Sequence, residues 1–195
     1  MLRAATVVGR TQRVEAGDAG ERMMKTCEDC HVRGEWRTPP EFWSVIDREF
    51  SITVDGAANA GNHLCDVWYG PGSPRGDDFI NPMIPPQNET IYINPPFGKM
   101  MPWVLAAYRA TINGRGNCVL MMARCAPSTR WWRVCVRSAS EIRLLSPRVD
   151  FLAPPGIDAS KNNQENALII FGARGPRWPK TDYILTWYWK ELAYA

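Results

Sequence analysis

The sequence lacks any segment suited to a membrane. Its 195 residues contain no apolar run of about 18 residues or more, the length that a spanning helix needs. Residues 1–9 hold one arginine and a short apolar stretch, which is too weak a pattern for a secretory signal peptide. These absences exclude a membrane-spanning protein, and we expect a cytoplasmic chain with no membrane partner.

Neither sign of charge dominates the sequence. Lys and Arg number 23 against 20 Asp and Glu, giving a formal net charge of +3 and a pI near 8.6. This balance permits contact with a polyanion such as nucleic acid but does not require it. Internal repeats and low-complexity tracts are missing too. The length suits one α/β domain without a large separate specificity domain, and we expect a monomer.

Six cysteines are present, and without a secretion signal we expect them to remain thiols in a reducing compartment. Cys27-x-x-Cys30-His31 has the spacing of half a zinc site, and His63-x-Cys65 is a candidate for the other half. Because the combined spacing is irregular, ordinary thiols are the favoured interpretation and no bound metal is expected.

The segments that are present alternate between strand and helix patterns. Helices are expected from Thr38 onward, around 103–110 and at 128–136. Strands are expected at 51–55, 90–93, 117–123, 141–145 and 167–171, with 149–152 as a candidate for one more and 70–90 as a long loop. This alternation predicts an α/β fold with a mostly parallel, doubly wound sheet.

Composition divides the chain into three parts. Residues 1–33 are polar and aperiodic, so we expect a disordered or loosely attached extension. Residues 34–173 hold the predicted elements and form the main domain. Residues 174–195 are aromatic and basic. This tail either touches nucleic acid or forms a last amphipathic helix docked on the sheet, and docking is favoured.

The strand at 90–93 runs directly into Asn94-Pro95-Pro96-Phe97. An exocyclic purine amine is a poor nucleophile, because its lone pair is delocalised into the ring. The Asn94 side-chain oxygen and the Pro95 carbonyl could accept hydrogen bonds from such an amine, and the prolines stiffen the turn. Phe97 offers a flat face to a flipped base. We predict that these four residues are catalytic.

A second predicted strand ends in Asp55, followed by Gly56 and Ala57. Ligands of open α/β sheets bind beyond the carboxyl ends of strands, so this carboxylate could hold an ammonium group while the small residues allow close approach. Asp78 and Phe79 follow in the long loop and could contact an adenine ring. A solvated acidic loop is the alternative for these two residues.

The order of these blocks over residues 35–171 resembles the phage-type (Dam-like) DNA N6-adenine methyltransferases. Trp36 and Thr38-Pro39 resemble the family's W-x-T-P-P opening, and Asp55 lies in a segment like its L-D-x-A-A turn. Residues 93–97 match its N-P-P-aromatic motif, and the later stretch like P-A-R-x-x-T-x-W contains Arg124, Arg130 and Trp131.

The resemblance implies a Rossmann-like methyltransferase fold with S-adenosylmethionine as methyl donor and double-stranded DNA as partner. It assigns Thr38, Pro39, Asp55, Gly56, Ala57, Asp78 and Phe79 to the cofactor. We assign Arg124, Arg130 and Trp131 to DNA. It places the protein in the cytoplasm of a host cell if the gene is a phage gene.

Two features depart from the family pattern, and they leave alternatives open. Phe97 replaces the commoner tyrosine, and the glycine-rich F-x-G-x-G turn is missing. An amino-methyltransferase acting on RNA or protein glutamine, and a non-catalytic DNA-binding relative, are the alternatives. We expect a short or relaxed DNA site preference, read by loops 66–90 and 124–133.

Overall fold

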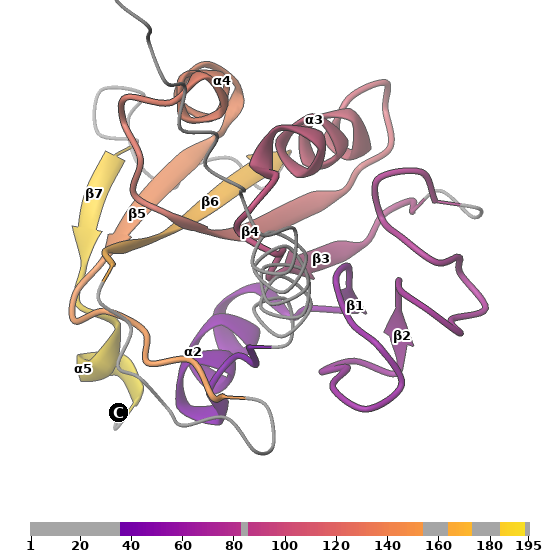
Figure 1. The fold of residues 1–195 in the computed structure, drawn as a ribbon, viewed down its shortest axis with the longest axis horizontal. Coiled ribbons are helices and arrows are strands. Elements are labelled where there is room, and N and C mark those ends of the chain that lie inside the picture. Colours follow the sequence, from indigo (N-terminus) through magenta and orange to yellow (C-terminus); the bar gives the residue numbers. More distant parts are fainter. Residues whose placement is uncertain (1–35, 83–85, 154–163, 173–183, 194–195) are drawn as a thin grey trace, which may run out of the picture.

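The computed structural model describes residues 36–82, 86–153, 164–172 and 184–193. The predicted extension 1–33, with its Cys27-x-x-Cys30-His31 pattern, lies outside the described residues. The described residues form a mixed α/β structure with a central sheet of seven strands (Figure 1).

The sheet has the strand order β2-β1-β3-β4-β6-β5-β7. Strand β6 is antiparallel to both of its neighbours, β4 and β5, and the other pairs are parallel. The mostly parallel sheet predicted from the sequence is therefore confirmed. The strands are β1 (Val54–Asp55), β2 (Val67–Trp68), β3 (Thr90–Ile93), β4 (Cys118–Arg124), β5 (Glu141–Leu145), β6 (Asn166–Gly172) and β7 (Ile184–Trp187).

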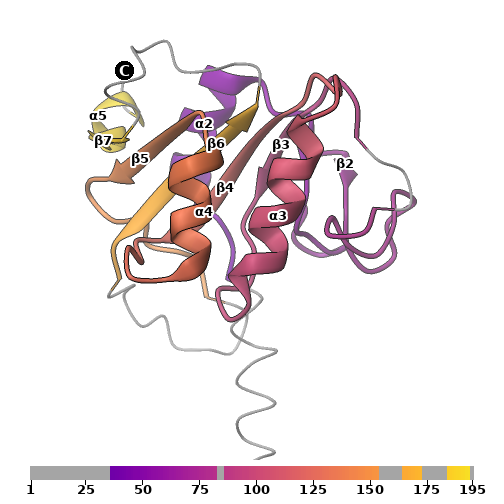
Figure 2. The ribbon, with the colours of Figure 1, turned by 90° about the horizontal axis from the view of Figure 1, so that it is seen from above.

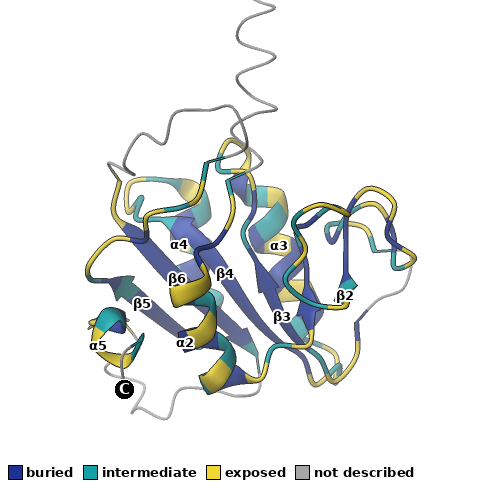
Figure 3. Ribbon diagram, turned by 90° about the horizontal axis from the view of Figure 1, so that it is seen from below, coloured by how far each residue is buried: buried dark blue, intermediate teal, exposed yellow. Residues whose placement is uncertain are grey.

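Helices cover both faces of the sheet. Helices α3 (Met100–Thr111) and α4 (Arg130–Ser138) lie side by side on one face (Figure 2). Helices α2 (Pro40–Phe50) and α5 (Trp189–Ala193) lie on the other, with the buried strands behind them (Figure 3). Each face has its own buried apolar cluster, so the central strands are covered on both sides.

Helix α2 shows how the sequence sets the boundaries around the first strand. Pro40 stands at its first position, and an apolar face that includes Phe42 and Ile46 is buried. The helix ends at Phe50 and is capped by Ser51, whose backbone is left-handed with φ 52°, and the Asp47 side chain accepts from the Ile52 N–H. The strand predicted at 51–55 therefore begins only at Val54, because its first residues complete the helix end.

Three further expectations needed correction. Residues 149–152 form no strand; Leu152 instead makes an isolated bridge with Arg37. Strand β2, at Val67–Trp68, was not expected from the sequence. The tail contributes strand β7, paired with β5, before the short helix α5, whereas one helix was expected. Trp189 of α5 is buried against Phe42 with ring centroids 5.1 Å apart.

Within the described part of the chain, none of the helices has the length and apolar character that crossing a membrane would require.

Candidate active site

Strands β1, β3 and β4 are parallel neighbours, so their carboxyl ends meet at one edge of the sheet. Asp55 pairs in register with Tyr92, and Ile93 with Met121. The chain moves from β1 to β2 on one side, then returns to β3 on the other. The strand order therefore reverses between β1 and β3, which is the place where open α/β sheets bind ligands. Asp55, predicted separately from Asn94, is the last residue of β1, and Asn94 directly follows β3.

The Asn94 side chain is held by the backbone of a distant segment. Its Nδ2 donates to the carbonyl oxygen of Trp36 at 3.1 Å. A carbonyl can only accept, so this contact fixes which end of the amide faces Trp36. Oδ1 is then the atom of the amide that can accept from a ligand. Pro95 is buried and Pro96 is exposed, so the turn is anchored on one side only.

A buried hydroxyl pair lies just behind the N-P-P-F loop (residues 94–97). The Thr38 Oγ1 and the Tyr92 hydroxyl are 2.7 Å apart, and both residues are buried. Burial raises the pKa of Tyr92 well above its ordinary value, so the phenol stays protonated at any working pH. The hydroxyl of Thr38, a residue predicted to contact the cofactor, is therefore hydrogen-bonded to Tyr92 of β3. Tyr92 lies two residues before Asn94.

Phe97 is half-buried and has aromatic and cationic neighbours. Phe151 meets it edge-on, with ring centroids 6.0 Å apart and planes at 70°. The Arg124 guanidinium lies 5.8 Å from the Phe97 ring centroid and donates to the Phe97 carbonyl at 3.4 Å. Arg124 also donates to Gln164 Oε1 at 2.6 Å. Arg124, predicted to bind DNA, is thus tied to the predicted catalytic loop.

The Asp55 carboxylate organises the turn that follows β1. It is 4% exposed, and its two oxygens accept from the backbone N–H groups of Ala57 at 3.2 Å and Leu64 at 3.1 Å. Burial raises the pKa of Asp55, while these two donors and nearby His63 oppose that shift. A buried carboxylate of this kind is suited to a cationic ligand group.

Gly56 lies directly against the neighbouring strand. Its N–H donates to the Tyr92 carbonyl at 2.7 Å. An added Cβ would meet Ile93 Cγ1 at 3.0 Å and Ile91 Cγ2 at 3.2 Å. A larger residue here would push β1 from β3, at the strand pair that holds both predicted site residues.

Asp78 and Phe79 are placed differently from the other predicted cofactor residues. Asp78 is half-buried and accepts from the Asn81 N–H at 2.6 Å, which closes a local turn. Phe79 is 2% exposed and packs edge-on against Tyr69 at 5.6 Å. The described hydrogen bonds do not link this pair to the turn after β1 or to the N-P-P-F loop.

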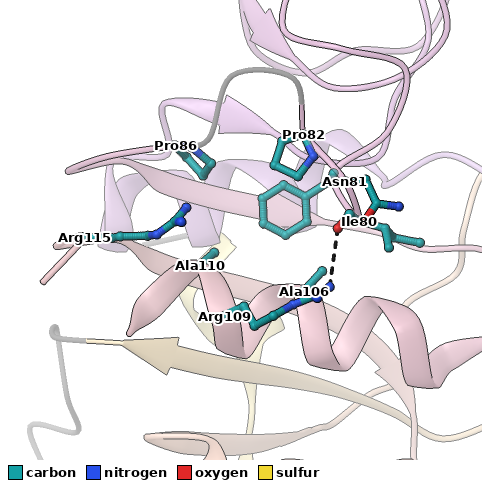
Figure 4. Close-up of a pocket in the computed structure, with 9 residues that line it drawn as sticks. Ile80, Asn81, Pro82, Pro86, Ala106, Arg109, Ala110 and Arg115 are labelled. Atoms are coloured by element: carbon teal, nitrogen blue, oxygen red, sulfur yellow. Dashed lines mark hydrogen bonds between the residues drawn. The ribbon is translucent and has the colours of Figure 1, made fainter. Parts of the chain in front are cut away.

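Phe79 also lines a cavity of about 390 Å³ beside helix α3 (Figure 4). Arg109 and Arg115 also line it, and Arg109 donates to the Ile80 carbonyl at 3.4 Å. Pro39, another predicted cofactor residue, is buried and its carbonyl accepts from Trp43 in the first turn of α2.

Arg130 and Trp131 are the first two residues of helix α4, which comes after the loop that follows β4. Thr129 caps the helix by accepting from the Trp132 N–H at 3.3 Å. Arg130 is exposed, whereas Trp131 is half-buried and packs on Trp132 with centroids 5.6 Å apart. A cavity of about 830 Å³, lined in part by Trp132 and Cys125, lies beside this helix start.

His63 and Cys65, the candidate second half of a zinc site, lie between β1 and β2. His63 stacks on Trp68 with planes at 8°, and its Nδ1 is 2.9 Å from the Cys65 carbonyl oxygen. Burial raises the pKa of Cys65 to about 12, which disfavours the thiolate. The described residues include no cluster of three or more metal-ligating side chains.

Sequence reasoning missed several residues that shape the site. The Trp36 contact is a backbone carbonyl, which no side-chain pattern reveals. Tyr92 stands in the predicted strand at 90–93, and a tyrosine in a buried strand indicates a hydroxyl that needs a partner. Phe151 and Gln164 come from segments where no functional pattern was seen.

Two comparisons with known proteins place the chain in a family. The family model for DNA N-6-adenine-methyltransferase (Dam) matches residues 25–183. A DNA N-6-adenine-methyltransferase of Haemophilus phage HP1 (strain HP1c1) is 26% identical over 148 residues, covering 72% of this chain and 80% of the phage protein. Because the family model spans well over half of the sequence and includes both strand ends of the candidate site, this chain belongs to the DNA N-6-adenine-methyltransferase (Dam) family.

Proposed function

We propose that this chain transfers a methyl group from S-adenosylmethionine to the N6 amino group of adenine in double-stranded DNA, on a Rossmann-like methyltransferase fold. The observation that carries the proposal is the held amide of Asn94. It stands at the carboxyl end of β3, beside Asp55 at the point where the strand order reverses.

The chemistry asks the protein to make a weak amine nucleophilic. Asn94 Oδ1 and the Pro95 carbonyl accept one hydrogen bond each from the two N–H groups of the amine, which keeps electron density on the nitrogen. The nitrogen forms its bond to the methyl carbon as the carbon–sulfur bond breaks, and the electron pair of that bond stays on sulfur. A general base is not needed before attack, because the methylated nitrogen becomes acidic and then releases its proton.

The residues present fit the cofactor's charge. S-adenosylmethionine supplies, when bound, a methyl group on a positively charged sulfur and also carries an ammonium group. The buried carboxylate of Asp55 is complementary to that ammonium, with Gly56 and Ala57 forming the adjacent turn. Further contacts with the cofactor remain predicted for Pro39, Asp78 and Phe79.

Base flipping would bring the target adenine to Phe97. Arg124 donates a hydrogen bond to the backbone carbonyl of Phe97, and Phe151 packs edge-on against the Phe97 ring. Exposed Arg130, with Trp131 beside it, supplies a positive charge at the start of α4 for the DNA backbone. The protein works as a monomer with a short or relaxed site preference.

The test is methyl transfer by the purified chain. Isotope-labelled S-adenosylmethionine is incubated with double-stranded DNA, single-stranded DNA, RNA or a protein extract, and nucleosides and amino acids are identified by mass spectrometry. We expect label in N6-methyladenine from double-stranded DNA. Label confined to RNA or to protein glutamine, or no label at all, would overturn the proposal.

Asn94→Ala is the matched variant for this assay. Loss of one positioned acceptor is expected to lower kcat by about 10²-fold or more. Asn113→Ala, in the exposed turn after α3, is the control and should retain activity. Full activity of Asn94→Ala would show that the methyl transfer does not use this amide.

A further inference from the structure

Two segments far apart in the sequence meet beside the end of β3. Arg37 and Leu152 form an antiparallel bridge, in which each backbone N–H donates to the other's carbonyl at 2.9 Å. Trp36, the residue before Arg37, holds the Asn94 amide at 3.1 Å. The segment that contains Arg37 is therefore connected to the first residue of the N-P-P-F loop.

The segment that contains Leu152 reaches the end of the same loop. Phe151 directly precedes Leu152 and packs edge-on against Phe97, with centroids 6.0 Å apart. The bridge thus touches both ends of the loop through residues adjacent to its pairing partners. A displacement of either segment would move the Asn94 amide and the Phe97 ring together.

A third contact fixes the bridge to the sheet itself. Thr38 follows Arg37 and hydrogen-bonds to the Tyr92 hydroxyl at 2.7 Å. The Tyr92 ring also meets Trp43 of helix α2 edge-on, at 5.5 Å. Both hydroxyls are buried, so losing one partner leaves the other without compensation. This pair therefore sets the depth at which residues 36–38 lie against β3.

We propose that the bridge between residues 37 and 152, secured by the Thr38–Tyr92 hydrogen bond, is a positioning device that holds the Asn94 amide with Oδ1 directed to the substrate amine. The proposal rests on the proposed function for its catalytic consequence. Thr38 is then a positioning residue that acts through Tyr92 and Trp36. This role differs from the cofactor contact implied by the family resemblance.

The first test separates positioning from cofactor binding. Thr38→Val removes the hydroxyl while keeping the side-chain shape, and Thr38→Ser restores it. We expect Thr38→Val to lower kcat about tenfold, with the KM for S-adenosylmethionine within about twofold of wild type, and Thr38→Ser to recover most of the rate. Tyr92→Phe should lose the same factor, and the double variant should lose no more, because both remove one shared bond.

A raised KM for S-adenosylmethionine with unchanged kcat in Thr38→Val would make Thr38 a ligand contact instead. Multiplicative losses in the double variant would show that the two residues act independently. Either result overturns the proposal. Thermal unfolding of each variant shows whether a lower kcat results from unfolding of the protein. Thr38→Ser serves as the folded reference.

The second test uses the requirement for a donor at position 94. Asn94→Asp keeps acceptor oxygens but removes the N–H groups, so an ionised carboxylate would face the Trp36 carbonyl and turn away. We expect activity about 10²-fold below wild type at neutral pH. The ratio of variant to wild-type kcat should rise as the pH falls, because the protonated acid can donate to Trp36 again. A ratio that does not change with pH would contradict the role given to Trp36.

A measurement independent of activity distinguishes failure of this proposal from failure of the proposed function. The Asn94 side-chain amide signals are assigned by nuclear magnetic resonance from their loss in Asn94→Ala. We expect these protons to be protected from solvent exchange in the wild type and to lose protection in Thr38→Val. Unprotected protons in the wild type would overturn the positioning device. Protected protons in a protein that methylates no nucleic acid would overturn only the function.

Discussion

At the scale of single residues, Asp55 carries a carboxylate where burial makes charge costly. Its folded-state pKa is raised above the ordinary value of 3.8. The stability that it contributes is therefore present at low pH and lost as the pH rises through the folded pKa. We expect the free energy of unfolding of wild type minus that of Asp55→Asn to fall as the pH rises from 3.8 through the raised folded-state pKa of Asp55. Urea unfolding of both proteins across this range checks the sign.

The same titration gives a readout of ligand binding. An ammonium group beside Asp55 would stabilise the carboxylate and lower its pKa toward the ordinary value. Saturating S-adenosylmethionine should therefore flatten the pH dependence of the difference between the two proteins. If the difference rises with pH, or if the cofactor leaves its slope unchanged, Asp55 does not have this electrostatic role.

At the scale of elements, one arginine joins α2, β5 and β7. Arg143 of β5 donates to both Glu49 oxygens at 2.6 Å and to Glu141 at 2.5 Å. Its guanidinium lies 4.6 Å from the Trp187 ring centroid on β7. The Arg143 and Glu141 side chains are 7% and 6% exposed, so neither charge is well solvated alone.

We expect Arg143→Met to lower the free energy of unfolding by about 3–5 kcal/mol, because it leaves the Glu141 charge buried without a partner. Exposed Arg137 of α4 is the control, and Arg137→Met should change stability by about 0.5 kcal/mol or less. Urea denaturation measures both. Equal stabilities for the two variants would show that the network is not needed to join these elements.

The elements differ in how far the sequence revealed them. Helix α2 and strands β3, β4 and β6 were predictable, because a regular apolar face marks the helix and short continuous apolar runs mark the strands. Strand β7 was missed, because its residues alternate between exposed and half-buried at a sheet edge and stand within an aromatic segment that also suits a helix. The bridge between 37 and 152 depends on backbone groups alone, so side-chain patterns carry no signal for it.

The sequence predicted some residues of the candidate site but not their contacts. Asp55 and Asn94 were found because each stands at the carboxyl end of a predicted strand, and the topology places those strands side by side. The contacts of Phe79 with the core were not visible in the sequence, because an aromatic residue in a polar loop suits a ligand and a core position equally. Tertiary packing alone separates these two interpretations.

At the scale of the whole molecule, a net charge of +3 is too small to draw DNA to the protein without local concentration of positive charge. Arg124 and Arg130 stand at the end of β4 and the start of α4, on the edge that also carries Asn94. Their environments differ, since Arg124 is tied to Phe97 and Gln164, whereas Arg130 is exposed. We therefore expect different consequences when each is neutralised.

Arg130→Gln should weaken binding to duplex DNA and reduce the slope of log K against log salt by about 0.9, because one phosphate contact is lost. Arg124→Gln should leave that slope close to wild type and lower kcat, because its guanidinium holds the carbonyl and ring of Phe97. Fluorescence anisotropy at several salt concentrations measures the slopes, and Arg137→Gln controls for general loss of charge. An unchanged slope in Arg130→Gln would show that DNA does not bind at the start of α4. A reduced slope in Arg124→Gln would show that Arg124 contacts the phosphate backbone directly.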